Sequence, residues 1–497
     1  LYVNHAQPAL SLDISGYTIK YNALDDIDYS GTIVKNLEGI NDGPTERNND
    51  ISLNFIHNNI AYDISINIFN TRHDLSNANV GLTVYTQPSN WSSNDVSANV
   101  GDTSANTIML KVSHSQEADT ADISGYKVDV SCNDLGWITH PFVYATNLAS
   151  DGTNSDVSLN DLSANMFYDI SINMWNIHDY SNNRLAVTYT TRPASFSRHD
   201  ISQNLSFDTS ANTITLKINK GQAATSLDIS AITIDYSGNN GANASSGTVI
   251  KKPSNTNPNG ILTDVSLNDI SANTRYDLSI NLINVNDISS DMIDISAVTR
   301  PSVRVAADCS QNLVDTSANT LMMKFNKGQI AGTLDISGFT FDISSHTLSY
   351  NSGNVNTGVL KTASNKDANG VLTDISLNNL TANTYYDLSV NMFNIYDLST
   401  AMIVASGTTR PATLTASDIS QNTGHSTSQI VFNIENSQPS GSLDISGYFF
   451  NSKRSIGTND LSKNIVTATN KGPTNTNTYT LSDLSSNSKY DISFNNI

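Results

Sequence analysis

Residues 266–284 read SLNDISANTRYDLSINLIN, and a version of this stretch occurs five times along the chain. From Tyr276 onward, large apolar residues alternate with small polar ones. A period of two places the apolar set on one face of a β-strand and the polar set in water. Residues 271–274, just upstream, have the composition of a tight turn. The stretch therefore predicts a strand, a corner and a second, longer strand.

Tyr276 opens the longer strand, where its ring can be buried while its hydroxyl bonds back to the corner backbone. This is the tyrosine-corner arrangement of β-sandwiches. The same tyrosine recurs at intervals of roughly 107 residues, which is one whole sandwich per repeat. The five predicted corner tyrosines are Tyr62, Tyr168, Tyr276, Tyr386 and Tyr490.

A Thr-x-Pro triplet closes each of the first four repeats, as at residues 299–301. Proline donates no hydrogen bond to a β-ladder and fixes its own φ, so it suits the exit from an edge strand. The strand pattern resumes within a few residues, and such short linkers favour a semi-rigid rod. Domains of roughly 35 Å, at about 3.3 Å per strand residue, give a rod of about 150 Å or more. The predicted domains are residues 1–88, 89–193, 194–301, 302–411 and 412–497.

The first and last repeats are shorter than the other three. Residues 1–3 align with residues 216–218, so the first domain is expected to lack its first strand. The last repeat stops inside the strand that opens with Tyr490, so it is expected to lack its final strand. We interpret the chain as a section of a longer array; the alternative is that strands of neighbouring chains complete the open ends.

The composition is acidic, with a net charge of −20 and a pI of about 4.6. Nucleic acid is excluded as an expected partner, because phosphate binding needs clustered cations. No run of about 18 apolar residues occurs, so no membrane span is predicted. The two cysteines lie in different repeats and form no disulfide framework. Cys309 stands where sister repeats have Ile, which favours a buried structural thiol; the sequence does not decide the role of Cys132.

The order of motifs resembles that of the fibronectin type III domain. In that family a strand with Y-x-V is followed by L-x-P-G-T-x-Y, by alternating residues that end in Asn, and by T-x-P. The second repeat matches these at residues 126–128, residues 162–168, Asn176 and residues 191–193. The resemblance spans all five repeats and implies an all-β chain of five tandem sandwich domains. The family's second-strand Trp and its corner Pro-Gly are both replaced here, so another immunoglobulin-like sandwich is the alternative.

No catalytic residue, cofactor site or metal site is predicted. The nine histidines form no H-x-x-x-H pair, and no Cys/His cluster has zinc spacing. One Asp recurs in the loop after each long strand, but a calcium site needs six or more oxygens, so a turn role is favoured. These loop residues are Asp74, Asp179, Asp287 and Asp397.

Two tryptophans and four sequons are the remaining candidates. Trp91 and Trp137 lie in irregular polar stretches and are candidates for surface contact. The N-x-S/T sequons matter only where the chain meets a glycosylation system. The candidate glycosylation sites are Asn90, Asn204, Asn243 and Asn379.

These observations favour a non-enzymatic structural or spacer protein of an extracellular, cell-surface or virion-surface fibre. Its expected partners are other protein chains of such an assembly. The first alternative is an adhesin or carbohydrate-binding tandem module with a glycan ligand, and a weaker one is the accessory region of a larger secreted enzyme. Fold-level resemblance does not choose among these functions.

Overall fold

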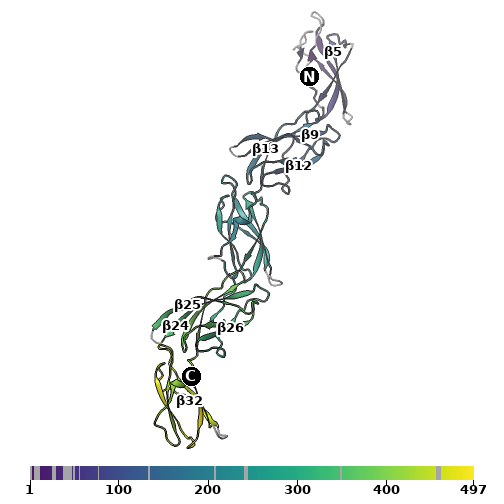
Figure 1. The fold of residues 1–497 in the computed structure, drawn as a ribbon. Helices are drawn as coiled ribbons and strands as arrows, with labels where there is room; N and C mark the ends of the chain where they lie inside the picture. Colours follow the sequence, from purple (N-terminus) through teal and green to yellow (C-terminus); the bar gives the residue numbers. More distant parts are fainter. Residues whose placement is uncertain are drawn as a thin grey trace.

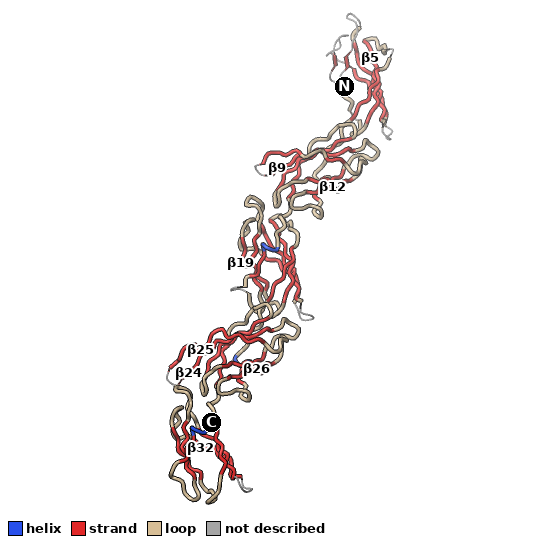
Figure 2. The backbone as a smooth tube through the Cα atoms, viewed as in Figure 1, coloured by secondary structure: helices blue, strands red, loops and turns tan. Residues whose placement is uncertain are grey.

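In the computed structural model, the chain forms five β-rich domains that follow one another along an elongated, winding path (Figure 1). Loops, rather than strands, meet where consecutive domains join (Figure 2). Among the residues that the structure describes, no helix is long and apolar enough to cross a membrane. The described residues are 3–4, 12–24, 29–36, 47–48, 51–54, 56–76, 78–132, 135–205, 209–239, 245–347, 350–454 and 460–497.

The third domain shows the architecture most clearly: two antiparallel sheets pack face to face. The three-stranded sheet has the order β15 (Ile201–Gln203), β16 (Ile214–Asn219), β19 (Ile261–Leu267). The four-stranded sheet has the order β18 (Ser246–Lys251), β17 (Ile229–Gly238), β20 (Arg275–Asn284), β21 (Ile293–Val298). Strand β20 is the longer strand that the repeated stretch predicts, and it lies in the centre of its sheet.

The same two strand orders recur in the second and fourth domains. In the second domain the three-stranded sheet has the order β7 (Val96–Ala98), β8 (Ile108–Ser113), β12 (Thr153–Leu159). The other sheet contains β9 (Ile123–Cys132), β13 (Phe167–Asn176) and β14 (Leu185–Thr190) in that order, and both β10 (Leu135–Thr139) and β11 (Val143–Tyr144) pair with the free edge of β9. In the fourth domain the three-stranded sheet has the order β22 (Cys309–Gln311), β23 (Thr320–Asn326), β26 (Val371–Asn378). The four-stranded sheet has the order β25 (Tyr350–Thr362), β24 (Ile336–Thr347), β27 (Tyr385–Asn394), β28 (Ile403–Thr408).

The first and fifth domains hold parts of the same arrangement among their described residues. The first has the sheet β3 (Ser30–Asn36), β2 (Ile14–Ala23), β5 (Ala61–Asn70), β6 (Val80–Tyr85), and the pair β1 (Val3–Asn4), β4 (Arg47–Asn48). The fifth has two three-stranded sheets. One has the order β29 (Ile419–Gln421), β30 (Ile430–Glu435), β33 (Thr476–Leu481), and the other has the order β32 (Asp460–Thr467), β31 (Gly447–Arg454), β34 (Tyr490–Asn496).

A single 3-10 turn precedes the first strand in three of the domains. In the third domain Asp200 accepts a hydrogen bond from the backbone N–H of Ser197 at 2.8 Å, which occupies a donor that the short turn leaves free. These turns are η1 (Arg198–Asp200), η3 (Ala306–Asp308) and η4 (Ala416–Asp418).

Alternation along the strands builds the core. In β20, Tyr276, Leu278, Ile280 and Leu282 are at most 1% exposed. Burying one such aliphatic side chain contributes roughly 1.5–3 kcal/mol. The hydrophobic residues form five separate clusters, within residues 3–84, 91–189, 196–297, 309–405 and 414–494. The chain is therefore an all-β tandem array of sandwiches, each stabilised by its own core.

Candidate functional site

The junctions between consecutive domains are the most regular polar sites in the described structure. The second junction is built around Asn165, in the corner between β12 and β13. Its φ is 54°, in the left-handed region that asparagine tolerates better than most residues. Its side chain is fully buried. The corner therefore turns the amide of Asn165 away from its own sandwich and into the joint with the third domain.

Asn165 uses both its backbone and its side chain to hold the next domain. The backbone N–H of Leu227 donates to the Asn165 carbonyl at 2.8 Å, and Asn165 Nδ2 donates back to the Leu227 carbonyl at 2.5 Å. Asn284 Nδ2, at the end of β20, donates to Asn165 Oδ1 at 3.0 Å. We call this set of hydrogen bonds the asparagine latch. It joins one residue of the second domain to two separate segments of the third.

The latch recurs in full at the first and third junctions and in part at the fourth. At the first and third, the Nδ2 groups of Asn176 and Asn394 donate to the corner asparagine at 2.9 and 3.1 Å. At the fourth, Leu443 N–H donates to the Asn383 carbonyl at 2.8 Å, while Asn496 Nδ2 donates to the Ala412 carbonyl instead. The four corner asparagines, with φ of 56°, 54°, 51° and 50°, are Asn59, Asn165, Asn273 and Asn383.

The linker itself is held on both sides of its proline. Before Pro193, the Arg192 carbonyl accepts from the backbone N–H of Asn165 at 2.8 Å. After it, the backbone N–H of Ala194 donates to Gln222 Oε1 at 2.7 Å, and Gln222 Nε2 donates to the Ala194 carbonyl at 3.0 Å. Glutamine occupies the position of Gln222 in the sister domains, at Gln116, Gln329 and Gln438. These bonds remove the rotational freedom that a short peptide linker would otherwise have.

A buried polar donor lies deep in each of the last four domains. In the second domain His114 is fully buried; its Nε2 lies 2.6 Å from Tyr126 Oη and its Nδ1 2.6 Å from the Ala149 carbonyl. In the third domain Lys220 Nζ donates to the Asn255 carbonyl at 2.6 Å. Burial lowers the pKa of both His114 and Lys220. The corresponding positions in the fourth and fifth domains hold Lys327 and Asn436.

These buried groups do not form a reactive site. The Ala149 carbonyl can only accept, so His114 carries its proton on Nδ1 and its Nε2 accepts from Tyr126 or Asn154. Lys220 and Lys327 bond to backbone carbonyls of the loop that crosses beneath them. Each group therefore ties a loop to the core of its own domain.

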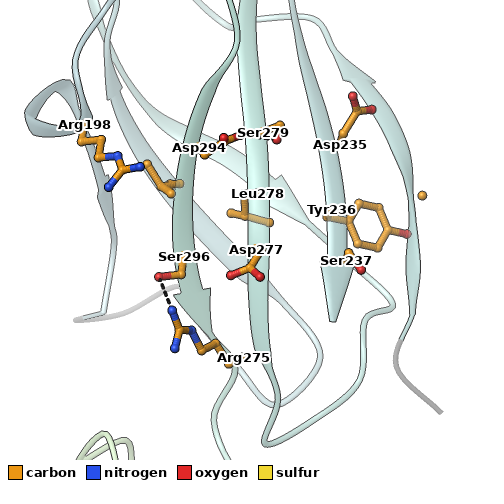
Figure 3. Close-up of a pocket in the computed structure, with 12 residues that line it drawn as sticks. Arg198, Asp235, Tyr236, Ser237, Arg275, Asp277, Leu278, Ser279, Asp294 and Ser296 are labelled. Carbon is orange, nitrogen blue, oxygen red and sulfur yellow. Dashed lines mark hydrogen bonds between the residues drawn. The ribbon is translucent and has the colours of Figure 1, made fainter. Parts of the chain in front are cut away.

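A groove of about 580 Å³ crosses the outer face of the four-stranded sheet of the third domain (Figure 3). Ser279 Oγ donates to Asp294 Oδ1 at 2.5 Å, and Arg275 Nη2 donates to Ser296 Oγ at 3.4 Å. Arg198 approaches from the side of η1 (Figure 3). The lining residues of the groove include no histidine or cysteine.

Among the described residues, no group of three or more His, Cys, Asp or Glu side chains could hold a metal ion. The loop that carries Asp179 is closed instead by Asn176, whose Oδ1 accepts from the backbone N–H groups of His178 and Tyr180. Asp179 contributes a left-handed backbone conformation, with φ of 61°. Cys132 and Cys309 are both free and buried, and burial raises the pKa of Cys309 to about 12.

The predicted corner tyrosines lie where the long strands begin. Each hydroxyl accepts a hydrogen bond from a backbone N–H five residues upstream, and Tyr276 also bonds to Ser245 Oγ at 2.7 Å. The five bonds are His57 N–H to Tyr62 at 3.0 Å, and Ser163 to Tyr168, Ser271 to Tyr276, Thr381 to Tyr386 and Ser485 to Tyr490, each at 2.7 Å.

The structure separates the two tryptophans proposed for surface contact. The prediction for Trp91 is wrong: it is 8% exposed, packs in the core of the second domain and donates its indole N–H to the His114 carbonyl at 3.2 Å. A polar sequence around an aromatic residue did not reveal that the side chain turns inward. Trp137 is 59% exposed.

The four sequons differ in accessibility. Asn90 and Asn379 are exposed, and Asn204 is half-buried in the three-stranded sheet of the third domain. Asn243 lies outside the described residues.

The latch was not recognised from the sequence. Its two asparagines recur in the sequence: one stands three positions before each corner tyrosine, and the other stands at the end of each long strand. A pattern of residues within one repeat does not show that its members face the next repeat. The contact of Asn284 with Asn165 spans 119 positions and exists only in the folded array.

The strand orders define the class of protein: a tandem array of two-sheet β-sandwich domains. No protein-family model matches the chain, and no curated protein sequence is similar to it. Two solved structures that are similar to it are the FN1–FN3 domains of chicken CNTN1 and a two-domain fibronectin type III segment from chicken tenascin.

The two similarities are weak over the whole array. The CNTN1 segment is 13% identical, with a TM-score of 0.25, and the match covers 65% of this chain and 98% of that chain. The tenascin segment is 15% identical, with a TM-score of 0.23, and the match covers 41% of this chain and 98% of that chain. The assignment of the fold therefore rests on the two sheets and their strand orders.

Proposed function

We propose that the chain is a non-enzymatic spacer, a rod of sandwich domains that holds distance at an extracellular, cell or virion surface as part of a fibre or surface assembly. We also propose that its domains divide at Pro88, Pro193, Pro301 and Pro411. The observation that carries the proposal is the asparagine latch. A spacer needs joints that resist bending. Each of the first three junctions is held by hydrogen bonds from two segments of the following domain, and the fourth is held by the bonds between Asn383 and Leu443.

The experiment is small-angle X-ray scattering of the chain, compared with a variant in which the corner asparagines Asn59, Asn165, Asn273 and Asn383 are all replaced by Ala. We expect the wild-type chain to scatter as one extended particle longer than about 150 Å, from five domains with strands rising about 3.3 Å per residue. We expect the variant to give a broad distribution of shapes. Equal shape distributions for the two proteins would contradict the role of the latch.

An adhesive or carbohydrate-binding role is the second candidate, because the second domain differs from its sisters at one sheet edge. That edge exposes Trp137 and Tyr144, at 59% and 77%. Exposed aromatic residues are common anchors of binding surfaces. A glycan array with the whole chain tests this role, and saturable binding that is lost on substitution of Trp137 would support it.

A further inference from the structure

The second domain carries an aromatic edge that is not found among the described side chains of the other domains. We use this name for Trp137, Ile138, Phe142 and Tyr144, which lie on β10, on β11 and between them. Their exposed fractions are 59%, 58%, 37% and 77%. The matching strand of the third domain, β18, reads SGTVIK and has no aromatic residue.

The ring of Phe142 packs against the sheet, whereas Trp137 and Tyr144 are more exposed. A Cβ atom on Gly125 would come within 2.6 Å of the Phe142 ring, so glycine at this position leaves room for that ring to pack on β9. The rings of Phe142 and Tyr144 are 5.2 Å apart and nearly perpendicular. Phe142 is thereby fixed, and it supports the more exposed Tyr144 beside it.

A buried carboxylate with one unused oxygen lies next to this edge. Asp129 on β9 is directly opposite Thr139 on β10, two residues after Trp137. Asp129 is 6% exposed; Arg184 Nη1 contacts its Oδ2 at 2.7 Å, whereas its Oδ1 has no hydrogen-bond partner among the described residues. A carboxylate oxygen can only accept, so the missing partner is a donor.

His140, which follows Thr139, has a second buried polar atom without a partner among the described residues. Its backbone N–H donates to the Val128 carbonyl at 2.9 Å, and its Nε2 is buried without a hydrogen-bond partner in the described part of the chain. Buried polar atoms without partners are uncommon in folded proteins, because each costs about 1–3 kcal/mol. Such atoms also occur at Asn281 and Asn391 of the sister domains, but among the described residues the one on Asp129 lies opposite a strand with exposed aromatic side chains.

We propose that the aromatic edge and Asp129 form a saccharide-binding site, in which sugar rings stack on Trp137 and Tyr144 and a hydroxyl donates to Asp129 Oδ1. Aromatic rings give flat apolar surfaces to the C–H face of a sugar, and hydroxyl groups are the donors that Asp129 lacks. Oδ1 is shielded from solvent, so the proposal requires a neighbouring side chain, such as the half-exposed Arg184, to move when the hydroxyl binds. A protein partner fits less well, because a stable protein interface uses about 20–30 residues a side.

This site deepens the second candidate function and leaves the spacer role independent of it. The first test is an array of neutral and acidic oligosaccharides probed with the whole chain, followed by titration of the strongest binder. All three tryptophans, Trp91, Trp137 and Trp175, lie within residues 89–193, so a change in tryptophan fluorescence reports on this domain.

The variants are Trp137→Ala, Tyr144→Ala and Asp129→Asn, and the matched control is Ile250→Ala on the equivalent edge of the third domain. We expect saturable binding that weakens about tenfold or more in each of the three variants and is unchanged in the control. Trp137 and Tyr144 are exposed, so their substitution leaves the fold intact even where Asp129→Asn does not.

Absence of saccharide binding would overturn the proposal, and so would Trp137→Ala and Tyr144→Ala variants that bind as tightly as the wild-type chain. Binding of a protein ligand at this edge without any saccharide would overturn it as well. Scattering by the same samples separates this result from the spacer role, because the length of the rod does not depend on the aromatic edge.

Discussion

The second and third domains are joined by the same latch and closed by the same tyrosine corner, but they differ at the sheet edge and in the buried donor. The second has Trp137 and Tyr144 on its edge and His114 in its interior, whereas the third has Lys220 in the interior and an edge without aromatic residues. The joint must match two surfaces at once, so its residues repeat. A sheet edge or a buried donor makes contacts only within its own domain, so the residues at these positions differ between the repeats.

The largest expected effect concerns the shared joint. We expect Asn165→Ala to destabilise the second domain by roughly 2–4 kcal/mol, because alanine is disfavoured at φ of 54° and the buried Asn284 amide loses its acceptor. Hydrogen exchange resolved by peptide measures this free energy in both the second domain and the fifth, which has no tryptophan. Asn487→Ala is the control: Asn487 has the same φ of 54° but is exposed, so only the backbone cost of about 1 kcal/mol is expected. Equal effects at the two positions would contradict the latch.

The shared corner is expected to respond alike in the two domains. Tyr168→Phe and Tyr276→Phe each remove a hydroxyl that accepts a backbone hydrogen bond at 2.7 Å, and each should cost about 1–2 kcal/mol. Hydrogen exchange resolved by peptide measures both domains in one chain. Tyr144→Phe, whose ring is 77% exposed, should cost almost nothing. A loss in only one of the two domains would show that the corner is not a shared device.

The buried donors are expected to make the two domains differ with pH. Burial lowers the folded-state pKa of His114 below 6.5, although Asp122 and Asp151 nearby oppose this shift. The unfolded chain then binds more protons, so the contribution of His114 is fully present above pH 6.5 and is lost as pH falls. The slope is at most about 1.4 kcal/mol per pH unit. The third domain has Lys220 there and should lack this histidine contribution.

Tryptophan fluorescence and hydrogen exchange at pH 7.5 and pH 5.5 measure this difference. The His114→Asn variant is the control, because the fifth domain has Asn436 at this position. We expect the variant to lose most of the pH dependence of the second domain. A pH dependence that is unchanged in the variant would exclude His114 as its source.

The smallest effect is expected at a contact that the first junction adds to the latch. Glu117 of the second domain contacts His57 Nδ1 at 3.1 Å and accepts from the Tyr29 hydroxyl at 3.0 Å, whereas the third domain has Ala223 at this position. These groups are exposed, so Glu117→Ala should cost less than about 1 kcal/mol, and less again at high salt. Unfolding in low and high salt measures it. A loss above that value would show that this junction depends on the contacts of Glu117.

Much of the fold was predictable because it depends on local pattern. Alternation in β20 predicted which residues are buried, and the turn composition before Tyr276 predicted the corner. Trp91 shows the limit: its neighbours are polar, but its ring fills the space above Tyr126, at a centroid distance of 6.0 Å. The candidate site was less predictable, because Asp129, Thr139 and Trp137 come together only through the pairing of β9 with β10.

The sequence by itself determined the β-sandwich, its repetition and its acidic polar surface, because strand periodicity and turn chemistry act between residues close together in the chain. Only the tertiary structure decided how the domains join and which polar groups are buried without partners. The latch pairs residues 117 to 121 positions apart where two asparagines meet. Their geometry follows from the packing of one finished domain on the next, which no single repeat specifies.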